Sequence, residues 1–418
     1  MNTAPQTLTG MRDLLPGDAA RFDALCRAFS EQFEAAGFGH LITPVIEDLA
    51  VFTRVGEGTD VVTKEMYAFE DRDGTMVALR PETTASVARA FLQHRPILPW
   101  KVWYLSQHFR HEKPQKGRYR QHHQLGAEAI GPTDPDLDVE MIVTLWDFYA
   151  SIGLQRLRLE INTLGLPENR TEYTRRLAEF LESRRDALDP VDAAKIESHP
   201  LRVLDSKSAM TIAALDGAPV LRECVSAEAV AHFERVQDGL RSAGIAFVVN
   251  DRLVRGLDYY THTVFEVISE AIDASQSTIG GGGRYDGLIE AMGGAATPGV
   301  GFGCGVERVL LACDAEGCFD PVPVPLDAFV LAFGGDGTDV RDVTLALRRA
   351  GFAVDRAFDG RSPKAQMKLA DRSGARYGVI SGDDERADNT VTVRDLRGDG
   401  AQRRIAISEL TNELRNLL

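Results

Sequence analysis

Residues 101–130 read KVWYLSQHFRHEKPQKGRYRQHHQLGAEAI, and this stretch decides the fold. Lys101 to Phe109 is rich in the aromatic and β-branched residues that are typical of a strand. A polar loop follows, and we expect a second strand from Gln121 to Ile130. Two long strands joined by a loop of this length pair antiparallel, whereas parallel strands need a longer crossover. The stretch therefore predicts an antiparallel sheet in the first part of the chain.

The loop between these strands is basic, although the whole chain is acidic, with a net charge of −15. Its charged residues, with the arginine that ends the first strand, are Arg110, Glu112, Lys113, Lys116, Arg118 and Arg120. The planar fork of an arginine matches the oxygens of a phosphate group. Phosphate binding and a merely solvated hairpin loop are both consistent with this pattern.

The returning strand carries polar residues of the same parity. Gln124, Gly126 and Glu128 project from one face of the strand because side chains alternate. Gly126 is expected to leave a gap between the two polar side chains, where a small polar ligand could lie against the sheet. The alternative is a solvent-exposed face of an antiparallel sheet.

Residues 79–84, LRPETT, join an expected strand to an expected helix. Pro81 is favoured at the first position of a helix, which would place Glu82 and Thr84 in the first turn. A carboxylate there is stabilised by the helix dipole. The segment is therefore either part of a site or an ordinary helix start.

Three further segments combine glycine with arginine or tyrosine. Residues 253–261, LVRGLDYYT, are either a binding edge or a turn with core aromatics. Residues 280–286, GGGGRYD, allow a close approach of the backbone to a ligand, or form a mobile loop. They match neither a Walker loop nor a dinucleotide fingerprint. In residues 299–305 a glycine at every second position leaves one strand face without side chains, where a flat ring could lie.

A helix is expected after residue 305, with Val306, Val309, Leu310 and Cys313 on its apolar face. Arg308 lies near its start, where the helix dipole disfavours a cation. This arginine therefore needs an anionic partner or a function, unless it is an ordinary surface residue.

The length of 418 residues predicts two or three domains, at about 150 residues each. Three prolines at alternate positions in residues 321–325 predict an extended linker. Residues from 326 onward carry 15 basic and 15 acidic side chains, so all excess acid lies upstream. We expect a catalytic core in residues 1–166 and 251–320, a mostly helical insertion in 167–250, the linker in 321–326 and a small α/β domain in 327–418.

Within the last of these domains, we expect strands at 328–333, 352–354, 377–380 and 390–393 and helices at 339–350 and from Pro363. This alternation predicts a mostly parallel sheet. The longest apolar runs fall far short of the roughly 20 residues that cross a bilayer. The start of the chain does not resemble a secretory signal. The five cysteines are too sparse for a disulfide framework or a zinc knuckle. We therefore expect a cytoplasmic protein with no membrane association.

Together these segments resemble the histidyl-tRNA synthetase family of class II aminoacyl-tRNA synthetases. The loop after Arg110 is similar to the second motif of the class, and residues 301–311 are similar to the third. Residues 37–47 resemble the first motif, which forms the dimer interface in the family. Residues 253–260 and 281–288 are similar to the two histidine-specific signatures. The segments at 10–13 and 200–207 fit as well. The resemblance implies an α+β fold, with an antiparallel catalytic core, a helical insertion and a C-terminal anticodon-binding domain.

The family's reaction uses ATP, with Mg²⁺, to activate L-histidine as histidyl-adenylate, and then charges tRNA(His). By resemblance, Arg255 and Arg110 are the catalytic residues, and the ATP-binding residues are Arg110, Arg118 and Arg308. The histidine-binding residues would be Glu82, Thr84, Gln124, Glu128, Tyr260 and Tyr285. The resemblance also implies a homodimer.

Four positions depart from or vary within the family pattern. The family usually has Gly where Thr83 and Ser86 stand and Phe where His122 stands, and His262 occupies a variable position. One alternative is the non-catalytic paralogue that partners ATP phosphoribosyltransferase in histidine biosynthesis. That paralogue usually lacks the C-terminal domain. The other is a relative that charges threonine or proline, which would carry different pocket signatures.

Overall fold

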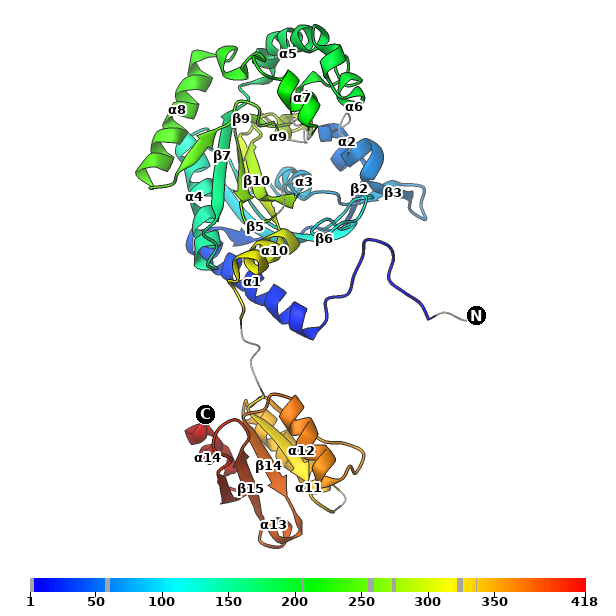
Figure 1. Cartoon of the computed structure of the whole chain (residues 1–418), viewed down its shortest axis with the longest axis vertical. Coiled ribbons are helices and arrows are strands. Elements are labelled where there is room, and N and C mark those ends of the chain that lie inside the picture. Colours follow the sequence, from blue (N-terminus) through cyan, green and yellow to red (C-terminus); the bar gives the residue numbers. More distant parts are fainter. Residues whose placement is uncertain are drawn as a thin grey trace. The chain divides into compact units, whose positions relative to one another are not determined.

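The computed structural model describes residues 4–56, 61–204, 206, 208–254, 259–272, 276–321, 326–335 and 337–418. The chain divides into two compact units, Met1–Asp320 and Pro321–Leu418 (Figure 1). Residues 322–325, which hold most of the expected linker, lie outside the described part.

An eight-stranded sheet forms the centre of the first unit. Its five inner pairings are antiparallel and the two outermost pairings are parallel. In spatial order the strands are β1 (Gly39–His40), β5 (Trp100–Phe109), β6 (Gln121–Ile130), β11 (Gly299–Gly305), β10 (Thr278–Arg284), β9 (Thr261–Ser269), β7 (Leu157–Thr163) and β8 (Phe247–Val249). The expected hairpin is confirmed, because β5 and β6 pair antiparallel along their full length.

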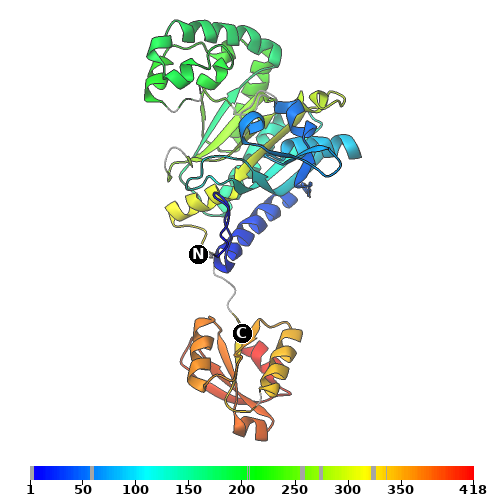
Figure 2. The ribbon, with the colours of Figure 1, turned by 90° about the vertical axis from the view of Figure 1, so that its right-hand side faces the viewer.

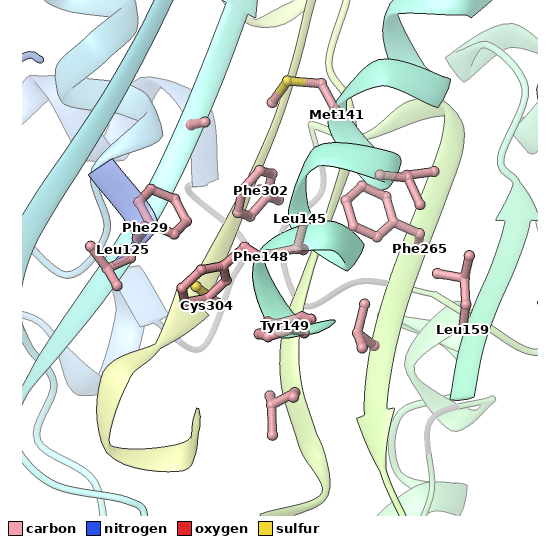
Figure 3. Packing of buried hydrophobic residues seen from close by; sticks show 14 of the residues in the cluster. Phe29, Leu125, Met141, Leu145, Phe148, Tyr149, Leu159, Phe265, Phe302 and Cys304 are labelled. Carbon is pink, nitrogen blue, oxygen red and sulfur yellow. The ribbon is translucent and has the colours of Figure 1, made fainter. Parts of the chain in front are cut away.

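Helices cover one face of this sheet and form the main core. They are α1 (Pro16–Ala35), α4 (Pro135–Ser151), α8 (Ala227–Ser242) and α10 (Val306–Glu316). Helix α4 begins where the Asp134 side chain accepts a hydrogen bond from Asp136 N and Pro135 takes the first position. Figure 3 shows Leu145 and Phe148 of α4 packed near Phe302 of β11. The odd-numbered residues of β6, such as Leu125 and Ala127, face this core. Its even-numbered residues therefore face the opposite side.

The opposite side of the sheet carries a smaller core. The elements here are α2 (Ala50–Gly56), α3 (Thr84–His94), α9 (Leu288–Ala291) and a three-stranded sheet of β2 (Ile46–Asp48), β4 (Met76–Leu79) and β3 (Tyr67–Glu70). Tyr104 of β5 and Tyr285, which follows β10, are buried in this cluster. These elements partly cover the face of the sheet that carries the polar residues Gln124 and Glu128 of β6. We call the region around these two side chains the sheltered site.

The stretch from 164 to 246 is largely helical. It contains α5 (Pro167–Glu182), α6 (Pro190–Ala193), α7 (Ala209–Ala214), α8 and short 3₁₀ turns at Arg185–Ala187, Pro200–Val203 and Leu221–Glu223. Figures 1 and 2 show α5, α6 and α7 gathered beyond one end of the large sheet. Leu177 and Leu181 of α5 belong to a separate apolar cluster. Phe233 and Leu240 of α8 instead belong to the main core. Asp205 and Lys207 of the expected insertion motif lie outside the described residues.

The second unit is a five-stranded sheet with helices on both faces. Its strands in spatial order are β13 (Val354–Arg356), β12 (Ala328–Ala332), β14 (Tyr377–Ser381), β15 (Thr390–Asp395) and β16 (Gln402–Ala406). Its helices are α11 (Thr338–Arg349), α12 (Pro363–Arg372), α13 (Asp383–Ala387) and α14 (Leu410–Leu417). Ser362 caps α12 by accepting a hydrogen bond from Ala365 N, and Pro363 takes the first helical position as expected.

The prediction of a mostly parallel sheet in this unit is wrong. Strand β12 pairs parallel with β13 and β14, but the pairs β14–β15 and β15–β16 are antiparallel. The reason is the length of the connections. A parallel pair needs a crossover of a dozen or more residues, and the segments after β14 and β15 are shorter than that.

Candidate active site

A buried carboxyl group lies at the centre of the sheltered site. Glu128 of β6 is fully buried and accepts three hydrogen bonds from hydroxyl groups. Thr84 Oγ1 donates to Oε1 over 2.7 Å, and Tyr104 OH donates to the same oxygen over 3.2 Å. Tyr285 OH donates to Oε2 over 2.6 Å. Donors from α3, from β5 and from the segment after β10 thus converge on one carboxyl group of β6.

Burial raises the pKa of Glu128 to about 8, and the hydroxyl donors only partly oppose this effect. Burial also raises the pKa of Tyr104 and Tyr285 well above 10, with the neighbouring Glu128 charge as the next cause. A cation or an N–H donor bound to such a carboxyl group would stabilise its ionised form, so a buried carboxyl with a raised pKa is a candidate for a functional site.

Glu82 lies at the start of α3, but not within its first turn. The expectation that Pro81 begins this helix is wrong, because α3 begins at Thr84. The Glu82 carboxylate accepts hydrogen bonds from Thr84 N at 2.7 Å and Ala85 N at 2.8 Å. Its side chain therefore caps the free N–H groups from outside the helix. Burial nevertheless raises the pKa of Glu82.

The glycines of β11 do not expose an open strip of backbone. An ideal Cβ on Gly301 would lie 1.6 Å from Glu128 Oε2, and one on Gly303 would lie 1.3 Å from Gln124 Nε2. The predicted place for a flat ring on this strand is therefore wrong. The glycines are needed because Gln124 and Glu128 of the neighbouring strand lie across them.

The gap expected at Gly126 is also filled. Gly126 lies opposite Tyr104 in the β5–β6 register, and a Cβ on Gly126 would meet the Tyr104 ring at 2.5 Å. The four glycines at 280–283 belong to β10 and are buried between β9 and β11, so the mobile-loop alternative is wrong. Arg284 at the end of β10 forms a buried ion pair with Asp138, which anchors the backbone next to Tyr285.

Three arginines gather at the other end of the site. Arg110 follows β5, and its Nε donates to Pro81 O at 2.9 Å. Arg308 donates to Gly117 O at 3.2 Å and to Thr278 O at 3.1 Å. Its pKa is lowered by burial and then by the nearby charges of Arg118 and Arg110. These close cations create a local positive field that suits an anion with several charges.

The hydrogen-bond partners of Arg308 are neutral carbonyl oxygens and not the anionic partner that was one of the two expectations for a cation near a helix start. The alternative of an ordinary surface arginine is wrong, because Arg308 is largely buried. Arg118 pairs with Glu112, with 2.6 Å between Nη2 and Oε1. Glu65 lies beside this pair, and burial followed by the Glu112 charge raises the pKa of Glu65. The basic loop is therefore partly neutralised by two carboxyl groups.

The N-terminal segment holds the basic loop in place through contacts of Gly10 and Arg12. Gly10 O accepts a hydrogen bond from Arg120 N at 2.8 Å. The Arg12 guanidinium lies 4.6 Å from the ring centre of Tyr119. These contacts explain how a loop of mostly polar residues keeps one conformation next to the arginines.

Comparisons with known proteins agree with this architecture. A family model described as "Histidyl-tRNA synthetase" matches residues 10–309, and one described as "Anticodon binding domain" matches residues 327–417. The chain belongs to the histidyl-tRNA synthetase family.

Relatives of similar length support the assignment to this family. The chain is 44% identical to a protein of Parasynechococcus marenigrum named "Histidine--tRNA ligase", over 97% of each chain. It is 44% identical to a protein of the same name from Rubrobacter xylanophilus, over 95% of this chain and 96% of the relative. The solved apo structure of the S. aureus histidyl-tRNA synthetase has a TM-score of 0.81 and 32% identity, and covers 99% of this chain and 100% of its own.

Most of the residues that the family pattern indicates are brought together. Glu82, Thr84, Glu128 and Tyr285 meet directly or through hydrogen bonds. Tyr260 is buried, and its ring centre lies 4.8 Å from that of Tyr259. Arg255 lies outside the described residues. Its expected catalytic role therefore stays a prediction.

Tyr104 is the functional candidate that the sequence analysis did not single out. It sits in the middle of β5, where an aromatic residue is unremarkable as a strand former. Tyr104 could have been found from its position opposite Gly126 in the expected hairpin, because a glycine opposite a large ring often marks a close contact. That register follows from the confirmed hairpin, but the contact with Glu128 depends on how the side chain turns.

Proposed function

We propose that this chain is a histidine–tRNA ligase. It activates histidine with ATP to give histidyl-adenylate and pyrophosphate, and then transfers the histidyl group to the 3′ end of tRNA(His). The observation that carries this proposal is the buried Glu128 with its three hydroxyl donors. The Glu82 charge acts on Glu128, and the Arg110 charge in turn acts on Glu82. Family membership and relatives named as histidine–tRNA ligases support the same reaction.

The imidazole of histidine would bind at Glu128 and Tyr260, with Tyr285 as the adjoining wall. An imidazole has two distinct nitrogens, and a carboxylate plus a phenol can satisfy both. An N–H donor placed on Glu128 lowers its pKa, so binding draws the carboxyl toward its ionised form. An amino acid whose side chain lacks such nitrogens would leave these buried groups unpaired, and the site would therefore reject it.

The α-ammonium group would bind at Glu82, Thr84 and Gln124. Glu82 is buried, and its oxygens already accept backbone hydrogen bonds, so the carboxylate is held in a fixed orientation. This arrangement directs the histidine carboxylate away from Glu82 and toward Arg110.

ATP would bind at Arg110, Arg118 and Arg308, with Arg255 completing the catalytic pair with Arg110. A carboxylate oxygen of histidine attacks the α-phosphorus, and the bond from that phosphorus to the bridging α–β oxygen breaks. Pyrophosphate leaves with the electron pair, and no net proton transfer is needed. Catalysis is therefore mainly the placement of cations around the transferring group.

Mg²⁺ would enter as part of the substrate, bound to the phosphates of ATP. In the described part of the chain, no group of three His, Cys, Asp or Glu side chains is arranged to hold a metal ion. A phosphate-bound Mg²⁺ needs only one or two protein carboxylates. Glu65 and Glu112, which lie beside the arginines, are the side chains that fit this requirement.

The second unit would bind the anticodon. A cleft of about 260 Å³ lies at the carboxyl ends of β12 and β13, the usual position of ligand sites in such sheets. Its walls include the loop of Gly334 and Gly335, with Arg356, Phe358 and Arg361. Phe358 is half exposed under the Arg356 guanidinium, so a nucleic-acid base could stack there.

A second copy of the chain would cover an exposed apolar surface of the first unit. The exposed apolar side chains that we assign to this surface are Ile42, Val45, Ile46, Phe69, Met76, Ile97 and Leu98. Ile97 is 92% exposed, which is costly for a monomer when neighbours are also apolar. The homodimer of the family is the occupant we propose.

We place the protein in the cytoplasm. In the described part of the chain, no helix is long and apolar enough to span a membrane.

The test is amino-acid-dependent exchange between ATP and pyrophosphate, measured with each of the twenty amino acids. We expect exchange with histidine alone, followed by charging of tRNA(His). Folded protein that gives no exchange would favour the regulatory paralogue. That alternative has less support, because the chain retains the C-terminal unit, Glu82, Arg110 and Arg308.

A further inference from the structure

A buried hydrogen bond joins two segments that carry opposite halves of the site. Thr83 Oγ1 and His108 Nε2 are 2.7 Å apart. The two residues are 1% and 0% exposed. Neither residue belongs to the set that would touch histidine or ATP, and Thr83 is one of the positions where the chain departs from the family pattern.

The bond joins the segment that would hold the amino acid to the segment that would bind ATP. Thr83 stands between Glu82 and Thr84, which would hold the amino acid. His108 lies two residues before Arg110, which would bind ATP. The segment 80–84 and the strand end 107–110 are also joined by three bonds to backbone carbonyls. These run from Phe109 N to Arg80 O at 3.1 Å, from Arg80 Nε to Gln107 O at 2.8 Å and from Arg110 Nε to Pro81 O at 2.9 Å.

The Thr83–His108 bond is the link nearest to Glu82 and Thr84. Thr83 precedes α3, yet its side chain does not cap that helix, because Glu82 takes this role. The Thr83 hydroxyl is therefore free to serve the contact with β5. The direction of the Thr83 hydroxyl, toward the buried imidazole of His108, is consistent with a role in joining the two segments.

The chemistry of His108 suits a permanent link. Its pKa is well below 6.5, because of burial first and then the neighbouring His122 and Arg110. The imidazole is consequently neutral, and Nε2 can accept the Thr83 hydroxyl proton. The His122 ring meets the His108 ring edge to face at 5.4 Å, which limits rotation of His108.

We propose that Thr83 and His108 are a positioning pair that sets the distance between the amino-acid half and the ATP half of the site. The inference rests on the proposed function. In the adenylation step, the histidine carboxylate must reach the α-phosphorus in a defined orientation. A displacement of one anchor by a fraction of an ångström changes this approach without removing any binding group.

The test compares Thr83→Val, Thr83→Ser, His108→Leu and the double variant Thr83→Val/His108→Leu in histidine-dependent exchange. We expect each single loss of the bond to lower kcat about tenfold, while KM for histidine and for ATP change less than about threefold. Thr83→Ser keeps the hydroxyl and should retain most of the activity. The double variant should be no worse than His108→Leu alone, because that variant already removes the bond to Thr83. His108→Leu also removes the contacts of the imidazole with Gln124 and His122, so its own loss can exceed that of Thr83→Val.

Thr144→Val is the matched control, since Thr144 is also nearly buried and donates to Glu140 O, away from the site. Unfolding midpoints of all variants separate a loss of folding from a loss of positioning, and Thr83→Ala replaces Thr83→Val if the latter does not fold. An unchanged kcat in Thr83→Val, or losses that simply multiply in the double variant, would overturn the inference. A wild-type protein without exchange would instead refute the proposed function.

Discussion

Tyr285 donates a 2.6 Å hydrogen bond to Oε2 of Glu128, although the two residues are 157 positions apart in the chain. One follows β10 and the other belongs to β6, and β11 lies between these strands in the sheet. The contact reaches across β11 only because glycine stands at position 301, directly opposite Glu128. The histidine pocket that we propose therefore depends on three strands at once.

Gly301→Ala should disrupt this pocket. The new Cβ would lie 1.6 Å from Glu128 Oε2, so the carboxyl group must move away from its hydroxyl partners. We expect KM for histidine to rise at least about tenfold in the exchange assay, with a smaller change in KM for ATP. Gly287→Ala is the matched control, because a Cβ there meets nothing within 4 Å. Equal kinetics in both variants would contradict the role of Gly301.

Glu128→Gln should change how stability depends on pH. The Glu128 pKa is about 8 in the folded chain, compared with an ordinary value of 4.5. Between these values the folded state binds more protons than the unfolded state, so this group makes stability fall as the pH rises. From pH 5.5 to 7.5 the wild-type unfolding midpoint should fall by a few degrees more than that of Glu128→Gln. Calorimetry at both pH values measures the difference, and parallel midpoints would exclude a raised pKa.

Arg308→Ala should remove a residue that we propose to bind ATP, together with two contacts that hold the site together. The guanidinium donates to Gly117 O in the basic loop and to Thr278 O in β10. We expect kcat/KM for ATP to fall at least about 100-fold, the loss typical of a preorganised donor. Arg175→Ala, which removes an exposed arginine paired with glutamates, should leave the reaction unchanged. Similar ATP kinetics in the two variants would refute the proposed role of Arg308 in ATP binding.

Ile97→Asp should weaken the proposed homodimer. A carboxylate at this exposed apolar position would be buried against the second copy without a partner. Sedimentation should show a mass near twice 45.8 kDa for the wild-type chain and a shift toward the monomer for the variant. Val191→Asp introduces the same charge at an exposed valine in the helical stretch and should remain dimeric. A wild-type chain that sediments as a monomer would refute the dimer.

Phe358→Ala should affect tRNA without affecting histidine activation. A base that stacks on an aromatic ring gains roughly 1–3 kcal/mol, so KM for tRNA should rise about tenfold. Exchange of pyrophosphate should keep its wild-type rate, because the histidine pocket that we propose lies in the other unit. Leu345→Ala in α11 removes another exposed apolar side chain and serves as the control. Unchanged charging kinetics would move the anticodon contact away from this cleft.

Much of the polar face was predictable from local patterns. The alternation in residues 121–130 places Gln124 and Glu128 on one face, and the structure confirms that face as the polar side of the site. The strong strand pattern of 101–109 similarly predicts β5 within one residue. These predictions succeed because side-chain alternation is a local property of an extended backbone.

Contacts across strands were not predictable in the same way. The open strip along β11 and the gap at Gly126 were wrong predictions, because neighbouring side chains fill both. The start of α3 was shifted because a glutamate outside the helix caps it. In each case a side chain contacts a neighbouring part of the structure, and the sequence of its own segment does not show where that neighbour lies.

The sequence by itself determined the boundary near residue 321 between the two units, the family and the identity of most candidate residues. Only the tertiary structure decided that Tyr104 joins Glu128, that Thr83 bonds His108 and that Arg308 lies near the arginines of the basic loop. The physical reason is that backbone preferences act over a few residues, whereas a site is assembled by packing between strands far apart in the chain. Which atoms then meet depends on register and side-chain rotation, and both are fixed only when the core is complete.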